Sequence, residues 1–327
     1  MYRLYFPLIL LFCLSSPASG QKQFLMPSDT FNQARFWACA GVGAGLYAGA
    51  SVGLYHAWYK NYDLGPFRTF DDSGEWMGMD KAGHLMTAYA QADIAYRGLR
   101  WTGLRPGRST LLAIGVGTVL QGTIEVMDGF SEKWGFSWYD IGFNTLGVGA
   151  FAAQQWAWGE QRIRFKMSNT RPRYSTAPIF STDGAQQSTL RERAYDLYGQ
   201  RYAEAFLKDY NGQIIWASAN LASFCGEDAP SWLPPWLNLA AGYGASNMYG
   251  GHGNTWADES TGANFSAPAA LQRQRQYYLS FDIDLKKIPF RKPWLRTACS
   301  LLNWIKIPSP SLELSPQGKV RFHPMLW

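Results

Sequence analysis

Residues 36–58 read FWACAGVGAGLYAGASVGLYHAW, a run of 23 residues without Asp, Glu, Lys or Arg. A helix of this length could cross a bilayer, which needs about 20 apolar residues. Gly41, Gly45, Gly49 and Gly53 recur about once per helical turn and would form a ridge that a second helix can approach closely. In water each of these glycines would cost roughly 1 kcal/mol relative to alanine. The run therefore predicts a helix in lipid or, alternatively, a buried helix of a soluble bundle.

Three further helices are predicted downstream of this run. Residues 81–99 have an amphipathic pattern, whereas residues 109–124 and 141–158 are apolar and carry no charged side chain. Apolar segments of this length are typical of helices rather than strands. We therefore predict a mainly α fold, in which residues 21–168 form a four-helix bundle of the membrane type.

The composition changes after this predicted bundle. Residues 169–188 are rich in Ser, Thr, Pro and Gly and are predicted to be a linker. In the remainder, residues 189–327, positions 277–285 alternate between apolar and polar side chains and form the clearest strand. Residues 237–243 could be another strand, and residues 214–224 could be a helix. We expect a smaller, mixed α+β region with a short antiparallel sheet.

The N-terminus has the pattern of a secretory signal peptide over residues 1–20. Arg3 precedes an apolar core at residues 4–14, and small residues stand before Gln21, where cleavage would occur. An uncleaved anchor is the alternative. Since position 21 is not a cysteine, we do not expect a lipid attached there.

Cysteines suggest no zinc site, because their spacing is too wide. After cleavage the chain keeps Cys39, Cys225 and Cys299. Cys225 and Cys299 could pair in an oxidising compartment, or all three could remain free thiols.

Charge placement bears on the location. If all four helices crossed a membrane, the basic segments would share one side and the acidic segments the other. The positive-inside rule would put the basic side in the cytoplasm, whereas a signal peptide would put it outside. We therefore expect a periplasmic or outer-membrane-associated protein rather than an inner-membrane protein, with its basic face towards anionic lipid.

The overall composition excludes a disordered chain, because 16% of the 327 residues are aromatic and only 17% are charged. Several tryptophans fall near the ends of the predicted helices, where interfacial belts place them. The net charge of +6 is mild, and the basic residues neighbour apolar helices. Membrane lipid and envelope proteins are therefore the expected partners, and nucleic acid is not; the oligomeric state is not predicted.

Eight polar residues stand at predicted helix ends on the acidic side, and folding should bring them together. The candidates for acid–base catalysis are His84, Asp80, Glu125 and Asp140, and the candidates for binding are Lys81, Asp128, Ser137 and Asn144. Carboxylates with a histidine could hold a water molecule, transfer protons or bind a divalent metal. No metal is indicated by the spacing itself, so a cofactor is not predicted.

Each of these residues also has a purely structural interpretation. Asp80 could cap its helix, and Ser137 with Asp140 could form a capping box. Asp128 precedes a glycine and could belong to a turn, and His84 could tie two helices together.

The motif series resembles a known family. It reads Asp80-Lys-x-x-His84, then Glu125-x-x-Asp128, then Ser137-x-x-Asp140-x-x-x-Asn144. This series resembles the YfiM-type family of predicted periplasmic lipoproteins of unknown function, and its order is similar to that of the VanZ-like membrane proteins. The resemblance implies an envelope location and a helical core but no known reaction, and the chain departs from it by lacking a lipidated cysteine.

Two functions follow as hypotheses. The first is an uncharacterised bacterial cell-envelope protein, membrane-embedded or membrane-associated, with a structural or binding role. The alternative is a metal- or acid/base-dependent hydrolase that acts on a polar lipid or isoprenoid-linked headgroup at the membrane interface.

Overall fold

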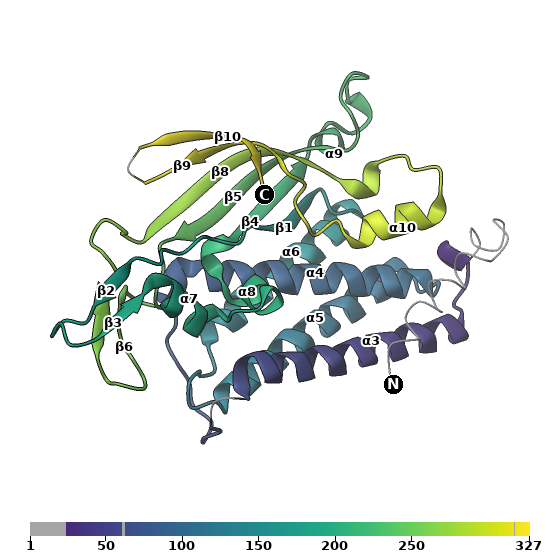
Figure 1. Ribbon diagram of the computed structural model, residues 1–327. Helices are drawn as coiled ribbons and strands as arrows, with labels where there is room; N and C mark the ends of the chain where they lie inside the picture. The colour runs from purple at the N-terminus through teal and green to yellow at the C-terminus, as the bar shows by residue number, and fades with distance from the viewer. Residues whose placement is uncertain (1–23, 61–62, 317) are drawn as a thin grey trace.

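The computed structural model describes residues 24–60, 63–316 and 318–327, and Figure 1 shows their arrangement. The predicted signal peptide lies outside the described residues. Four long helices occupy the first half of the chain: α3 (Gln33–Leu54), α4 (Met79–Trp101), α5 (Pro106–Gly129) and α6 (Trp138–Trp158). Helices α4, α5 and α6 each contain one of the predicted helical segments, whereas α3 covers the predicted run 36–58 only to Leu54, and the rest of that run lies in η1 (Tyr55–Tyr59).

Close packing unites α4, α5 and α6. A methyl group built on Gly147 would lie 2.2 Å from the carbonyl oxygen of Leu85, so the backbones of α6 and α4 nearly touch. The core between the three helices consists of one aromatic pair and small residues: Tyr89, Phe151, Ala92, Ala113 and Ala152. Small residues permit this approach because they keep side chains out of the helix interface.

Helix α3 differs from the other three, because none of its residues is buried. It lies at the edge of the helical layer beside α5 (Figure 1), where the Tyr47 hydroxyl donates a 2.9 Å hydrogen bond to Thr123 Oγ1. A methyl group on Gly41, Gly45 or Gly49 would meet no described atom within 4 Å. The prediction that another helix approaches this ridge closely is therefore wrong for the described chain.

The second half of the chain is built on a six-stranded antiparallel sheet. Its strand order is β1 (Ile163–Asn169), β4 (Gln213–Asn220), β5 (Leu237–Ser246), β8 (Gln274–Ile283), β9 (Ser309–Leu314) and β10 (Val320–Leu326). Two short hairpins pair β2 (Pro178–Phe180) with β3 (Gln187–Thr189) and β6 (Thr255–Ala257) with β7 (Asn264–Ser266).

Shorter helices connect these strands. The α-helices are α7 (Leu190–Tyr198), α8 (Tyr202–Lys208), α9 (Leu221–Cys225) and α10 (Pro293–Leu301). The single turns are η1 (Tyr55–Tyr59), η2 (Glu75–Gly78), η3 (Tyr210–Gly212), η4 (Gly226–Asp228) and η5 (Leu285–Lys287). Cys39, Cys225 and Cys299 are all free thiols, so the two that could pair do not.

The predicted fold class, mainly α with a short sheet, is wrong. The structure is 46% helical and 22% strand, which makes it an α+β fold with a helical layer against a large antiparallel sheet. Strand β1 begins inside the region predicted to be helical bundle, and β4 lies where a helix was expected. The membrane type of the bundle is also unsupported, since only α3 and α5 among the described helices are long and apolar enough to cross a bilayer.

The inner face of the sheet carries both a buried ion pair and a small apolar cluster that includes Trp216 and Tyr278. Lys166 on β1 and Asp282 on β8 are three strands apart in the sheet order, yet their side chains form a 2.7 Å ion pair, and both are fully buried. On the outside, Phe165 and Ile215 pack against α4 residues such as Met79. Farther along the same outer face, Phe281 on β8 and Phe322 on β10 remain more than half exposed.

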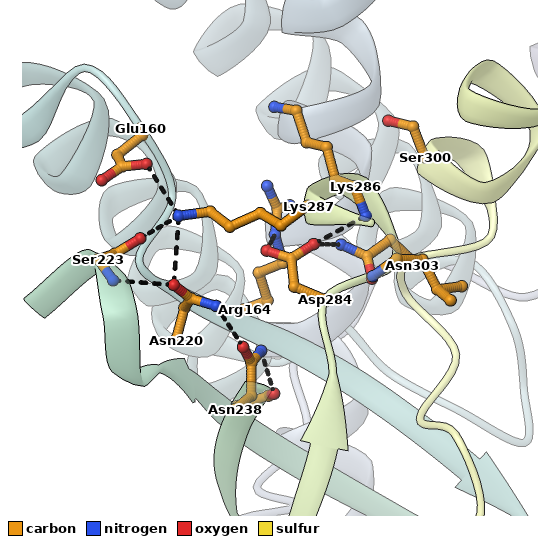
Figure 2. A network of polar contacts seen from close by, with 12 residues as sticks. Glu160, Arg164, Asn220, Ser223, Asn238, Asp284, Lys286, Lys287, Ser300 and Asn303 are labelled. Carbon is orange, nitrogen blue, oxygen red and sulfur yellow. Dashed lines mark hydrogen bonds and ion pairs between the residues drawn. The ribbon is translucent and has the colours of Figure 1, made fainter. Parts of the chain in front are cut away.

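A network of charged groups joins this sheet to the helices (Figure 2). Arg164 on β1 contacts Asp93 of α4 at 3.1 Å and Asp284 at 3.4 Å. In the same view Lys287 reaches towards Asn220 at the end of β4 and Glu160 after α6. Since buried charges require partners, these contacts fix how the sheet lies on α4.

Candidate functional site

The predicted polar residues meet at one end of the helical layer. His84, Asp80 and Lys81 lie in the first turns of α4, Glu125 and Asp128 in the last turns of α5, and Ser137, Asp140 and Asn144 at the start of α6. The beginning of α4 and the beginning of α6 lie beside the end of α5, so all eight side chains belong to one cluster. We call it the helix-end cluster.

Lys81 is the central cation of the helix-end cluster. Its ammonium nitrogen lies 2.6 Å from Asp72, 2.9 Å from Asp80 and 2.7 Å from Asp140. Burial on its own would lower the pKa of Lys81, but Asp80 and Asp140 raise it above its ordinary value. The lysine therefore stays charged and contacts three carboxyl groups, one from a loop, one from α4 and one from α6.

The ring of His84 lies among carboxylates from three helices. Its Nδ1 is 3.1 Å from Asn144 Oδ1 and 3.5 Å from Glu125 Oε1, and its Nε2 is 3.8 Å from both Asp80 and Asp140. Burial opposes protonation, but the nearby Asp80, Asp140 and Glu125 raise the pKa of His84 above its ordinary value. The Asn144 oxygen accepts from Nδ1, which turns Nε2 towards the two aspartates.

Three carboxyl groups of the cluster retain protons to unusually high pH. Burial raises the pKa of Glu125 and of Asp128 to about 7 and that of Asp140 to about 8. The side chain of Glu125 is inaccessible to solvent, and its Oε1 makes no hydrogen bond with any described residue. The cluster can therefore exchange protons near neutral pH, which is the range that acid–base chemistry requires.

Some residues of the cluster have structural roles that the sequence suggested. Ser137 caps α6 by accepting a 3.1 Å hydrogen bond from the Asp140 amide, and its hydroxyl donates to Asp72 at 2.5 Å. The capping role considered for Asp80 is wrong, because Gly78 stands at the N-cap of α4. Asp80 instead contacts Lys81 and accepts from Tyr210.

Three residues of the cluster were missed by sequence reasoning. Asp72 comes from the loop before α4, Tyr59 ends η1 and donates to Asp128 at 2.6 Å, and Tyr210 in η3 donates to Asp80 at 2.6 Å. None of the three belongs to the motif series, and no local pattern connects them with it. Only the acidic pair at positions 71 and 72 gave a weak signal.

The donor set of Asp80, His84 and Asp140 could accept a metal ion. One ligand atom from each lies within 4.8 Å of the others. Both carboxylates, however, also contact the ammonium group of Lys81. A cation bound there would compete with Lys81 for the same oxygens, so the three residues fit a metal only if Lys81 gives way.

Comparison with known proteins supports one part of the predicted resemblance. The profile of a family described as predicted periplasmic lipoprotein (DUF2279) matches residues 68–155. This segment is less than half of the chain but includes all eight predicted site residues. Searches of the curated proteins and of the solved structures found no match.

The match supports a cell-envelope, periplasmic location and an uncharacterised function. It supports the resemblance to a periplasmic family of unknown function, whereas the YfiM-type and VanZ-like assignments are not confirmed. Neither catalysis nor membrane embedding follows from it.

Proposed function

We propose that this chain is a periplasmic envelope protein whose helices α3 and α5 lie against a lipid surface. Its role is binding or structural rather than catalytic. The observation that carries the proposal is the outward face of these two helices. Leu46 on α3 is 70% exposed and Val119 on α5 is 62% exposed, and α3 buries none of its residues. Contiguous exposed apolar surface on this scale marks a contact site for lipid or protein.

The helix-end cluster fits a structural and binding role within this protein. Lys81 holds carboxylates of three segments, and Tyr210 brings the sheet half of the chain to Asp80. Breaking such a buried network is costly, because it leaves a charge without its partner. We infer that the cluster keeps the helical layer and the sheet in one arrangement while the apolar face of α3 and α5 meets lipid.

Membrane washing tests the lipid contact. We expect the protein to remain with envelope membranes in high salt and to be released by detergent. The double variant Leu46→Asp and Val119→Asp should move most of the protein to the soluble fraction. Leu207→Asp, a matched change at a residue of α8 that is 48% exposed, should leave it on the membrane. Complete release of the unchanged protein by salt alone would contradict the proposal.

Acid–base hydrolysis of a polar lipid headgroup is the second candidate. It is favoured by the position of His84 between carboxylates and by the pKa of about 7 at Glu125. His84 and Glu125 would transfer protons, and Asp80 and Asp140 would orient the histidine or, with it, hold a divalent cation.

The test of this candidate is a lipid profile of cells that carry His84→Asn or Glu125→Gln at normal protein levels. Accumulation of one headgroup-bearing lipid in both variants supports hydrolysis. An unchanged profile in both leaves only the structural and binding role.

A further inference from the structure

A cavity of about 270 Å³ lies in the second half of the chain, outside the helix-end cluster. It is open on one side and is lined by residues of the segment that follows β1, of α7 and Gly199, and of α8 and Asp209; Figure 1 shows where these segments lie. The polar side chains that line it include Arg171, Arg173, Arg191, Tyr174 and Asp209. This volume lies just below the usual range for ligand sites, about 300–1,000 Å³, and suits a small molecule.

The cavity carries positive charge that its own residues do not neutralise. Three guanidinium groups line it, against the single carboxylate of Asp209. That carboxylate already accepts from the Tyr174 hydroxyl at 2.8 and 2.9 Å. Arg173 and Arg191 both line the cavity, both are exposed, and neither forms an ion pair with any residue in the described ranges. Two unpaired guanidinium groups at one opening favour an oxyanion, because each can donate two parallel hydrogen bonds.

Aromatic rings form the inner wall of the cavity. Tyr174 and Tyr198 stack with ring centroids 6.4 Å apart, and both rings line the space. The Tyr174 hydroxyl donates to Asp209, which also lines the cavity, and the Tyr198 hydroxyl donates to the carbonyl oxygen of Met248, outside it. The ring faces therefore provide an apolar surface, and the arginines provide positive charge. Together they fit a small organic molecule with one anionic group.

We propose that this cavity binds a small phosphate ester, with the phosphate held by Arg173 and Arg191 and the rest of the molecule against Tyr174 and Tyr198. A phosphate carries more than one negative charge and three acceptor oxygens, so it matches two guanidinium groups better than a carboxylate does. The ester could be a free molecule or the headgroup of a phospholipid, since both present the same chemistry. The site is independent of the lipid contact of α3 and α5.

Titration calorimetry on the purified full chain tests this site with three probes: glycerol 3-phosphate, glycerol, and vesicles of phosphatidylglycerol compared with phosphatidylcholine. We expect binding of glycerol 3-phosphate or of phosphatidylglycerol vesicles, and none of glycerol. Binding of the free ester identifies a soluble ligand. Binding of the vesicles alone identifies a headgroup only if it is lost in the Arg173 and Arg191 variants, because α3 and α5 would hold vesicles without these arginines. Absence of binding to both phosphate-bearing probes overturns the proposal.

Matched variants locate the binding. Arg173→Gln combined with Arg191→Gln should raise the Kd by roughly a hundredfold, about tenfold for each lost charge-assisted contact. Arg291→Gln combined with Arg321→Gln removes the same charge at two exposed positions outside the cavity and should leave the Kd unchanged. An equal loss of affinity in both double variants would overturn the proposed site. Unchanged affinity in the Arg173 and Arg191 double variant would also overturn it. Arg173→Lys keeps the charge, so its Kd should lie between that of the unchanged protein and that of the double variant. This result would show that the double variant loses contacts and does not simply unfold.

Discussion

The Tyr210 hydroxyl donates a 2.6 Å hydrogen bond to Asp80 Oδ1 across 130 positions of the chain. Tyr210 belongs to the turn before β4, and Asp80 begins α4, so this contact joins the sheet half to the helix-end cluster. The Tyr210 ring also lies 5.7 Å from that of Trp76, next to the same end of α4. The cluster is therefore a property of the whole fold and not of the helical layer alone.

Replacing Tyr210 with Phe should lower the free energy of unfolding by about 1.5–3 kcal/mol, because a buried carboxylate loses a hydrogen-bond donor. Urea denaturation measures the change. Tyr202→Phe, at an exposed tyrosine of α8, is the matched control and should change stability by less than about 0.5 kcal/mol. Equal stability of the two variants would show that the contact between the halves contributes nothing.

Replacing Lys81 with Met should cost about 3–5 kcal/mol, because the buried carboxylates of Asp72 and Asp80 lose their common cation. Adding Asp72→Asn to this variant should recover part of the loss, since the pKa of Asp72 lies below its ordinary value and one uncompensated charge disappears. Lys292→Met, at an exposed lysine, serves as the control. If the double variant is less stable than Lys81→Met, the carboxylates do not repel one another as the geometry implies.

Stability should fall as the pH rises from about 5 to 8. Burial raises the pKa of Glu125 from 4.5 to about 7, so the folded chain holds a proton that the unfolded chain releases in this range. This stabilisation is on the order of 3 kcal/mol. It is complete at a pH below the ordinary pKa of 4.5 and is lost as the pH rises through the folded-state pKa of about 7. His84, whose pKa is also raised, changes stability in the same direction.

Glu125→Gln should flatten this pH dependence, because the amide does not titrate. Urea denaturation at pH 5.5 and pH 8 measures the slope for both proteins. Glu259→Gln removes a carboxyl group that is almost fully exposed and should keep the slope of the unchanged protein. A steeper slope in Glu125→Gln would contradict the assignment of the proton to this group.

Two glycines of α6 should respond in opposite ways to replacement by alanine. At Gly147 the new methyl group would meet the Leu85 carbonyl oxygen at 2.2 Å, so α4 and α6 must separate, at a cost of about 1–3 kcal/mol. At Gly149 it would meet nothing within 4 Å, and alanine should stabilise the helix by up to about 1 kcal/mol. Thermal unfolding compares the two, and similar changes in Tm would show that the helices are not in close contact.

The sequence predicted the helix-end cluster well, because its residues follow regular helical spacing and stand where helices begin and end. Asp80, Lys81 and His84 share one helix start, and Ser137 with Asp140 has the spacing of a helix cap. Tyr59 and Tyr210 could not be found in this way, because each lies far in the sequence from the carboxyl group that it contacts. These contacts depend on how the whole chain packs.

The sheet was underestimated for a different physical reason. Strand prediction relies on alternation between large apolar and polar side chains, and β8 shows it clearly. Strand β4, with the sequence QIIWASAN, has only small residues after Trp216, so its alternation is weak and a helix was predicted there, whereas a strand was predicted at residues 237–243 of β5. These small side chains leave room for the buried Lys166 and Asp282, a long-range requirement that no local pattern reveals.

The last strand of the sheet has a consequence for self-association. In the described chain β10 occupies an edge, with Val320 and Phe322 exposed, and an open strand edge of this kind is a template for growth into filaments. Its pairing with β9 is interrupted between His323 and Leu326, and Pro324 lies in that interval. A proline has no amide hydrogen to offer, so an incoming strand could not extend a continuous ladder there. The apolar edge strand β10 thus also contains the residue, Pro324, that hinders amyloid-like stacking on it.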